Sequence, residues 1–246
     1  MILDNFPKVL WINLDKSLNR KIYMETLLKT NNISNTRISA INGLCKNGDL
    51  EKISIINPKI SRAENACTCS HLKAIKYFID HMTDQKVIIF EDDVSFEFLK
   101  YIPFNWGVFE KHLPKDYDLI QLAVTVDNGT VKPILLKTTP ANHYYCSAAY
   151  LITREGGKKL ISRYYDKNSM INLLNQTYLT SDAMISSTGN TYSIPIFTYG
   201  TSDSTIHPNH SNIHSRSKQN QLFEWKNFNL NLNGFDADKY FGNKLS

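Results

Sequence analysis

Short apolar runs alternate with amphipathic segments along most of this chain. Runs of the length that buried strands have lie at residues 9–14, 37–41, 87–90, 118–122, 146–152 and 192–197. Apolar residues spaced by three or four positions predict helices over residues 17–30, 62–81 and 154–165, with a short helix near 182–187. Because strands and helices follow one another, the pattern indicates an α/β fold with a mixed, mostly parallel sheet flanked by helices.

Two segments lack such a pattern. Residues 44–60 read as a loop, and from about residue 201 the chain becomes rich in Ser, His and Asn, which predicts a loop-like tail. The sequence contains neither an internal repeat nor a low-complexity linker. We therefore expect one α/β domain over residues 1–206, with residues 207–246 forming a C-terminal tail or lid that packs on the same domain.

Composition narrows the class of protein. Of the 246 residues, 42% are hydrophobic and 21% are charged with both signs mixed, which excludes intrinsic disorder. The net charge of +5 is compatible with an anionic small molecule as partner. Only six of the 28 basic residues are Arg, the residue that most often reads bases and phosphates, so we expect no nucleic-acid partner.

Cysteine usage and hydropathy bear on the compartment. The four cysteines, Cys45, Cys67, Cys69 and Cys146, are too sparse for a disulfide scaffold and predict reduced thiols. No apolar run reaches the roughly 20 residues that a transmembrane helix needs, and residues 1–8 lack the apolar core of a secretory signal. We expect a cytoplasmic location, in a bacterium or in the host of a virus, since the Asn, Ile and Lys content is typical of an AT-rich genome.

The sharpest chemical feature is the triplet Glu91-Asp92-Asp93 directly after the apolar run 87–90. Ligands of open α/β sheets bind at the carboxyl ends of the strands. Alternate residues of an extended chain face the same side, so Glu91 and Asp93 should share one face while Asp92 faces the other. Such oxygen ligands suit Mg²⁺ or Mn²⁺. The alternative is a solvated acidic turn.

Five sequence blocks in order carry a family resemblance. They are Trp11–Asp15 with the downstream Arg20, Ala40–Gly43, Cys67–His71, Glu91–Val94 and Ala149–Gly156. They are similar to the I-N-L strand, the A-[IV]-[DN]-G block, the G-C-x-x-S-H helix, the acidic motif and the A-Y-L-I-[ST]-R-x-G block of glycosyltransferase family 25. That family includes bacterial lipopolysaccharide-type glycosyltransferases and procollagen galactosyltransferases. The resemblance covers residues 8–206, and one departure is Ala66, where the family usually has Gly.

The resemblance implies a GT-A nucleotide-sugar-binding fold whose acidic "DxD" motif holds a metal ion on the donor diphosphate. Asp93 would be the principal ligand, with Glu91 in support and Asp92 near the ribose or a metal-bound water. A late His completes the metal shell in many such enzymes, which makes His207 the first candidate and His210 the second. An imidazole among carboxylates favours Mn²⁺ over Mg²⁺.

The resemblance also implies a donor site for a UDP-sugar, UDP-galactose or UDP-glucose. Asn13 and Asn42 follow two predicted strands and would contact the uridine or ribose, while Arg20 would reach a phosphate. Ser70 lies in the third block and joins this set. For Arg20 the alternative is a surface helix residue, and for the neighbouring His71 it is a hydrogen-bonded core residue.

Transfer in the family inverts the anomeric centre and needs a general base for the acceptor hydroxyl. Asp182 is the candidate, although it or Ser181 could simply cap a helix, and Asp118 and Glu155 are runners-up. The acceptor would be a glycan or the hydroxylysine of a collagen-like chain. Of the aromatic residues near such sites, at most one should stack on a sugar; the candidates are Tyr144, Tyr145, Trp106 and Trp225.

Two other function classes compete with a galactosyl- or glucosyltransferase of glycan biosynthesis. One is a catalytically inactive nucleotide-sugar-binding protein on the same fold. The other is a Mg²⁺-dependent phosphotransferase or nuclease that uses the same carboxylates, although the sequence has no Gly-rich phosphate loop of the P-loop type. The sequence leaves the oligomeric state open, a homodimer included.

Overall fold

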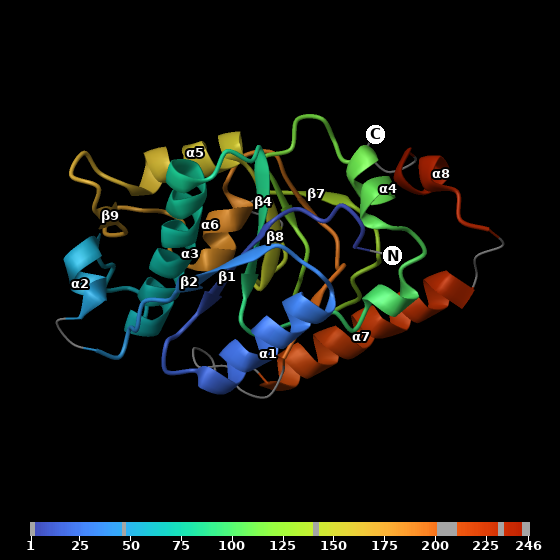
Figure 1. The fold of residues 1–246 in the computed structure, drawn as a ribbon, viewed down its shortest axis with the longest axis horizontal. Coiled ribbons are helices and arrows are strands. Elements are labelled where there is room, and N and C mark those ends of the chain that lie inside the picture. The colour runs from blue at the N-terminus through green and yellow to red at the C-terminus, as the bar shows by residue number, and fades with distance from the viewer. Residues whose placement is uncertain (1–2, 46–47, 140–142, 201–210, 231–233, 243–246) are drawn as a thin grey trace.

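A seven-stranded sheet forms the centre of the computed structural model, which describes residues 3–45, 48–139, 143–200, 211–230 and 234–242 (Figure 1). The strands follow the order β2-β1-β4-β8-β6-β10-β7. Their bounds are β1 (Val9–Asn13), β2 (Asn35–Ser39), β4 (Lys86–Glu91), β6 (Leu119–Gln121), β7 (Leu136–Thr138), β8 (Ala149–Thr153) and β10 (Thr191–Ser193). β2, β1, β4, β6 and β10 point one way, and β8 and β7 point the other way. The predicted α/β fold with a mixed, mostly parallel sheet is confirmed.

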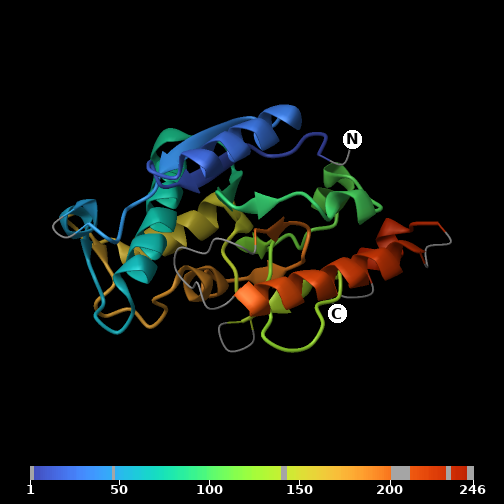
Figure 2. The same ribbon diagram turned by 90° about the horizontal axis from the view of Figure 1, so that it is seen from below.

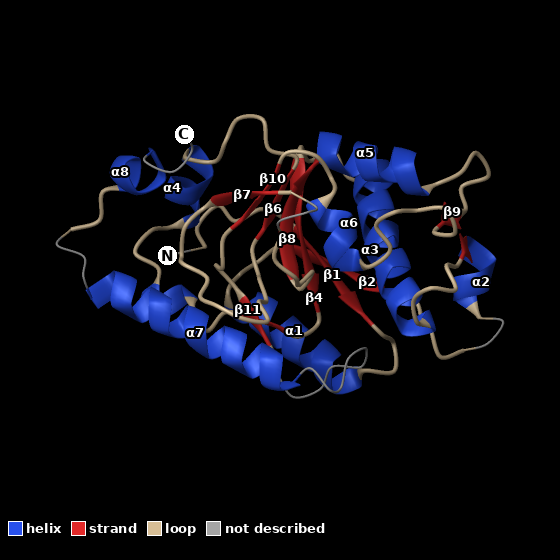
Figure 3. Cartoon of the chain, turned by 180° about the vertical axis from the view of Figure 1, so that it is seen from behind, coloured by secondary structure: helices blue, strands red, loops and turns tan. Residues whose placement is uncertain are grey.

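Helices cover both faces of this sheet (Figure 3). α3, α5 and α6 pack on one face, while α1, α4, α7 and α8 contribute to the core on the other. Figure 2 shows that these two helices lie apart: α1 lies beside β1 and β2, whereas α7 lies away from both strands. The bounds are α1 (Leu18–Thr30), α2 (Asp49–Ile53), α3 (Arg62–His81), α4 (Trp106–Lys111), α5 (Arg154–Tyr164), α6 (Ser181–Ser186), α7 (Ser211–Leu230) and α8 (Ala237–Gly242), with a 3-10 helix η1 (Leu99–Tyr101).

The strand β4 shows how the apolar pattern builds two cores. Val87 and Ile89 belong to the core under α3, and Ile88 and Phe90 belong to the core on the other face. All four side chains are fully buried. A strand buried on both faces needs a continuous apolar run, which is why this segment was readable from the sequence.

Four short strands lie outside the main sheet. They are β3 (Ser54–Ile55), β5 (Val94–Ser95), β9 (Ile171–Asn172) and β11 (Thr198–Tyr199). β5 pairs with β11 immediately after the acidic motif, and β3 pairs with β9. The single strand predicted over residues 192–197 is therefore wrong: β10 and β11 are separate, because Pro195 has no N–H for a sheet ladder.

The structure corrects two further predictions, one through a local hydrogen bond and one through long-range contacts. Residues 44–60 are not all loop, because α2 begins after Gly48, whose N–H donates to the Glu51 carboxylate at 3.1 Å. The tail is not loop-like but contains the helix α7. Its Trp225 is fully buried and donates from Nε1 to the Pro195 carbonyl at 2.6 Å, and Gln221 donates to the Val124 carbonyl at 2.9 Å. The predicted boundary at residue 206 lies outside the described residues.

The start of α3 is held by a reciprocal pair of hydrogen bonds. Ser61 caps α3 by accepting from the Glu64 N–H, and the Glu64 carboxylate accepts from the Ser61 N–H in return. This reciprocal pair satisfies two N–H groups that a helix start otherwise leaves unbonded. Among the described residues, no helix combines the length and the apolar content that crossing a membrane requires.

One glycine of the family-like block at residues 149–156 is required by packing. A Cβ at Gly156, in the first turn of α5, would lie 2.4 Å from the Asp118 carbonyl oxygen. We expect Gly156→Ala to lower the free energy of unfolding by about 1–3 kcal/mol. Gly107→Ala in α4 is the matched control, since its Cβ meets nothing closer than 3.5 Å, and it should leave stability unchanged or raise it by up to about 1 kcal/mol. Urea denaturation measures both, and equal effects would contradict the packing argument.

Candidate active site

The acidic triplet lies at the end of β4, between two cavities. The first, which we call the acidic cavity, has a volume of about 420 Å³ and is lined by Glu91, Asp93 and Asp182 together with side chains of several loops. The second, which we call the strand-end cavity, has a volume of about 290 Å³. Its wall contains the whole predicted donor-binding set, namely Asn13, Arg20, Asn42, Ser70 and Asp92. The strand ends therefore gather these side chains from distant parts of the sequence.

Asp92 is the centre of the strand-end cavity's polar wall. Its Oδ2 accepts from Asn13 Nδ2 at 2.6 Å, and its Oδ1 accepts from Arg20 Nη1 at 2.7 Å. The Arg20 guanidinium also lies 4.0 Å from the Asp93 carboxylate. Burial alone would lower the pKa of Arg20, but the charges of Asp93 and Asp92 outweigh it and raise that pKa. Arg20 therefore remains a cation at the border of the two cavities and is more than a surface helix residue.

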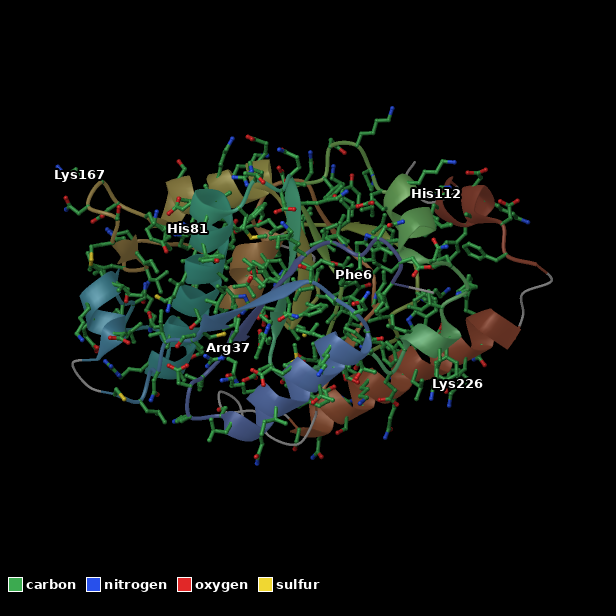
Figure 4. The ribbon with its side chains drawn as sticks, viewed as in Figure 1. Phe6, Arg37, His81, His112, Lys167 and Lys226 are labelled. Carbon is green, nitrogen blue, oxygen red and sulfur yellow. The ribbon has the colours of Figure 1, made fainter. Side chains whose placement is uncertain are left out.

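Arg37 of β2 belongs to the same network, although sequence reasoning missed it. It is paired in register with Trp11 of β1, and its guanidinium lies over the Trp11 ring. Its Nε donates to Asn13 Oδ1 at 3.0 Å, so the Asn13 amide nitrogen is turned toward Asp92. Figure 4 labels Arg37 near the edge strands of the sheet. The sequence did contain a signal for this role of Arg37. A charged residue inside a predicted strand needs a polar partner on a neighbouring strand.

Asn42 and Ser70 shape the loop after β2. Ser70 Oγ accepts from the Ile41 N–H at 2.9 Å and donates to the Ala66 carbonyl at 2.7 Å. Asn42 Oδ1 accepts from the Leu44 N–H at 3.1 Å. Both residues line the strand-end cavity while their side chains hold the backbone around it. Direct contact between these two residues and a nucleotide stays a prediction.

The departure at Ala66 falls on a tight contact between that loop and α3. A Cβ at Gly43 would lie 2.5 Å from the Arg62 carbonyl oxygen and 3.0 Å from the Ala66 Cβ. The glycine of the Ala40–Gly43 block is therefore needed for close approach of two backbones. The Ala66 side chain, where the family usually has Gly, lies at this close approach.

Glu91 and Asp93 face the acidic cavity, as strand alternation predicts, and Glu91 also reaches the wall of the strand-end cavity. Glu91 Oε1 accepts from Ser147 Oγ at 2.6 Å and lies 3.1 Å from His71 Nε2. Burial alone would raise the pKa of Glu91, but the hydrogen bond and charge of His71 outweigh burial and lower it. Glu91 is thus held as a carboxylate inside the protein.

Asp93 has the opposite environment. Within the described part of the chain, its Oδ1 is buried and has no hydrogen-bond partner. Burial and the neighbouring charge of Glu91 raise the pKa of Asp93 to about 7, against the lowering effect of Arg20. A buried carboxylate oxygen without a donor is costly and calls for a proton or a cation. The oxygen donors of Asp93 and Glu91 fit a hard divalent cation.

Asp182 reaches the same cavity from the first turn of α6. The cap of this helix is Thr180, whose Oγ1 accepts from the Ala183 N–H at 3.3 Å, so Asp182 is not needed as a cap. Burial and the charge of Glu91 raise the pKa of Asp182 to about 6. A carboxylate that titrates this close to neutrality is suited to proton transfer.

A strained turn before β8 supports Asp182 and was not predicted. Cys146 has a φ of 97°, which is rare for a residue with a side chain. Gln121 holds the turn by donating from Nε2 to the carbonyls of Tyr144, Tyr145 and Cys146 at 3.2, 3.0 and 2.7 Å. The charge of His71, the Ser147 side chain and the Cys146 backbone at this turn each lower the pKa of Asp182, in opposition to burial. Strain of this kind concentrates at functional sites.

The structure separates the two runner-up bases from this cavity. Asp118 precedes β6, at the opposite end of that strand from Gln121, and its carboxylate accepts from Lys159 Nζ at 2.7 and 2.6 Å. Glu155 is exposed and accepts from Lys158 at 2.7 Å. Neither carboxylate lines the acidic cavity. Of these three candidate bases, Asp182 is the one that lines the acidic cavity, whose wall also includes Glu64 and Asp127.

The remaining predicted residues divide between the cavity, the core and the undescribed segment. Of the four aromatic candidates, Tyr145 is half exposed and lines the acidic cavity, whereas Trp106 and Trp225 are buried in the core. Tyr144 is partly buried and does not line this cavity. His207 and His210 lie outside the described residues. The tail does reach the site, because Ile213 and His214 of α7 line the acidic cavity.

A mixed α/β sheet with carboxylates clustered at a strand end is the architecture of a GT-A-like glycosyltransferase. Comparison with known families agrees: residues 6–184 match glycosyltransferase family 25, described as an LPS biosynthesis protein family. The match spans most of the chain, and this protein belongs to glycosyltransferase family 25.

Comparisons with individual proteins give distant likenesses. No curated protein matches the chain. Among solved structures, A197 from STIV is 11% identical with a TM-score of 0.45, over 78% of this chain and 84% of that one. HddC from Yersinia pseudotuberculosis is 15% identical with a TM-score of 0.36, over 78% of this chain and 72% of that one.

Proposed function

We propose that this glycosyltransferase is a metal-dependent, inverting hexosyltransferase. It would move galactose or glucose from a UDP-sugar to a hydroxyl of a glycan or of hydroxylysine. The observation that carries the proposal is the grouping of Glu91, Asp93 and Asp182 around one cavity, with a buried Asp93 oxygen that lacks a partner in the described structure. Such a grouping supplies a cation site and a proton acceptor side by side.

The strand-end cavity is the proposed place of the nucleoside. Its wall combines apolar side chains such as Ile12 and Leu14 with the amide and carboxylate groups of Asn13 and Asp92. A uracil ring and a ribose need this mixture of apolar surface and few oriented polar groups. Arg20 stands where the two cavities meet, so the diphosphate would lie beside its guanidinium.

Asp93 and Glu91 would hold Mn²⁺ or Mg²⁺, and His207 remains a candidate ligand outside the described residues. A bound divalent ion stabilises the negative charge that grows on the leaving diphosphate. Arg20 adds a fixed positive charge on the same side. Ser147 and His71 keep the Glu91 carboxylate in one orientation.

Asp182 is the proposed general base. The acceptor oxygen would attack the anomeric carbon as the bond to the diphosphate breaks, and Asp182 would take the hydroxyl proton. Its raised pKa makes it a stronger base than an exposed carboxylate. Tyr145 lines the same cavity and offers an aromatic face for the acceptor or donor sugar.

The direct test is a screen of nucleotide sugars for UDP release, with Mn²⁺, with Mg²⁺ and with a chelator. We expect release from UDP-galactose or UDP-glucose that requires the metal ion. Tight UDP binding without turnover on any acceptor would instead identify a binding protein. Nucleotide cleavage that needs no sugar would point to a phosphotransferase or nuclease. If no nucleotide sugar binds or turns over, the proposal fails.

Arg20 provides a test of the donor site. Arg20→Ala should weaken UDP binding by about 10-fold to 100-fold, because a charge-assisted hydrogen bond is worth about 1.5–3 kcal/mol. Lys21→Ala is the matched control, since Lys21 carries the same charge on the same helix but lies 3.9 Å from Glu25 on the surface. Isothermal titration calorimetry with UDP measures both. Equal affinities for the two variants would move the diphosphate away from Arg20.

A further inference from the structure

The third family-like block, Cys67–His71, places two metal-binding side chains on one face of α3. Cys67 and His71 are four residues apart, so they lie one above the other on the helix. Glu91 of β4 faces them across the sheet end. Cys67 and Glu91 line both cavities, and His71 lines the strand-end cavity. The three side chains therefore stand at the junction of the two cavities.

The ligand atoms of this trio are already close together. Cys67 Sγ, a ring nitrogen of His71 and a carboxylate oxygen of Glu91 all lie within 4.8 Å of one another. His71 Nε2 and Glu91 Oε1 are 3.1 Å apart. Zinc bonds of about 2.0–2.3 Å hold tetrahedral ligand atoms about 3–4 Å apart. Small side-chain rotations would close the remaining gap.

Two hydrogen-bonding groups hold the His71 and Glu91 side chains in the orientation that a metal ion needs. His71 Nδ1 lies 3.0 Å from the hydroxyl of Tyr150, a fully buried residue of β8, which fixes the ring and leaves Nε2 directed at Glu91. Ser147 Oγ donates to Glu91 Oε1 at 2.6 Å. Metal-bound imidazoles and carboxylates commonly have such second hydrogen bonds. This support is independent of the trio's own spacing.

We propose that Cys67, His71 and Glu91 form a second cation site, which takes a thiophilic divalent ion such as Zn²⁺. Thiolate and imidazole select such ions, whereas the oxygen ligands of Asp93 suit Mg²⁺ or Mn²⁺. When the ion binds, the thiol proton of Cys67 and the Nε2 proton that His71 donates to Glu91 both leave to solvent. A thiolate and a carboxylate then balance the ion's double charge. Ser181 Oγ lies 3.5 Å from Cys67 Sγ and offers a further oxygen next to the trio.

Occupancy of this site has a consequence for the proposed transfer reaction. Zn²⁺ bound to Glu91 would take this carboxylate away from the acidic cavity and separate the two cavities with a bound ion. Zn²⁺ would therefore inhibit transfer. This consequence rests on the proposed function, whereas the binding site itself does not, so binding is measured without any sugar substrate.

The test is a titration of the full chain with Co²⁺ in the absence of Mg²⁺ and Mn²⁺, because Glu91 is also a proposed ligand of the oxygen-ligand site and those ions would compete for it. A bound thiolate gives a sulfur-to-cobalt charge-transfer band in the near ultraviolet. We expect one equivalent to produce this band, Zn²⁺ to abolish it, and Cys67→Ser to lose it. The Zn²⁺ affinity of Cys67→Ser should fall by about 100-fold or more, because losing even a group that only hydrogen-bonds to a metal ligand costs about 10-fold to 100-fold. Cys45→Ser and Cys146→Ser are matched controls that should keep the band.

A second measurement uses the unaltered protein, in case Cys67→Ser does not fold. Burial raises the pKa of the Cys67 thiol, so the metal-free protein is first treated with iodoacetamide at high pH until Cys67 is alkylated. Stoichiometric Zn²⁺ should then slow the alkylation of Cys67, while the exposed Cys45 stays reactive. A missing band in the wild-type protein, a band that persists in Cys67→Ser, or unprotected Cys67 would each overturn the site. If the protein binds Zn²⁺ in this way but releases no UDP from any nucleotide sugar, the result supports the cation site and contradicts only the proposed function.

Discussion

Replacing Asp93 by asparagine should lower metal-dependent UDP release by about 10²–10³-fold or more, the cost of removing one charged group that stabilises a transition state. Asparagine keeps the shape of the side chain and removes its charge. The loss should appear in kcat, because the charge on the leaving diphosphate develops in the transition state. Asp80→Asn is the matched control, since Asp80 pairs with Lys76 on the surface of α3, far along the helix from the site. It should retain full activity.

The same substitution should not destabilise the metal-free fold. The pKa of Asp93 rises from an ordinary 3.8 to about 7 on folding, so the native state binds this proton more tightly than the unfolded state does. Stability that is present below pH ~4 is therefore lost as pH rises toward 7. Asp93→Asn removes this loss, and its thermal midpoint without metal at pH 7 should equal or exceed that of the wild type. A variant that is both inactive and less stable would indicate a structural role instead.

Replacing Asp182 by asparagine should lower turnover by about 10²–10⁴-fold, the usual contribution of a positioned general base. The affinity for UDP should change little, because Asp182 lines the acidic cavity and not the strand-end cavity. The base must be ionised, and its pKa is about 6. The wild-type rate should therefore fall as pH drops below about 6.

Glu155→Gln is the matched control for this experiment. Glu155 occupies the first turn of α5 as Asp182 occupies the first turn of α6, but it is exposed and pairs with Lys158. It should retain turnover and the same pH profile. If Asp182→Asn keeps most of the activity, or if the acid limb of the profile is unchanged, the base is another group.

Local patterns were sufficient for much of the fold. The helix predicted over residues 62–81 coincides with α3, whose cap Ser61 and partner Glu64 are only three residues apart in sequence. β4 was readable because burial on both faces leaves a continuous apolar run. The helix α7 was missed because two of its buried side chains, Ser217 and Gln221, are polar and only Trp225 is apolar. The helix therefore lacks a clear helical spacing of apolar residues. α2 was missed because five residues are too few to show a period.

The sequence alone determined the family blocks, the strands that end at the site, and the expectation that Glu91 and Asp93 share one cavity, although Asp92 and Asp93 form a turn after β4 and Glu91 lines both cavities. These depend on neighbours in the chain. Only the tertiary structure decided that Arg37 orients Asn13, that Gln121 holds the strained turn at Cys146, and that Asp93 keeps an unpartnered buried oxygen. Such contacts join residues tens of positions apart, and the pKa shifts of Asp93 and Asp182 arise from burial, which no local pattern encodes.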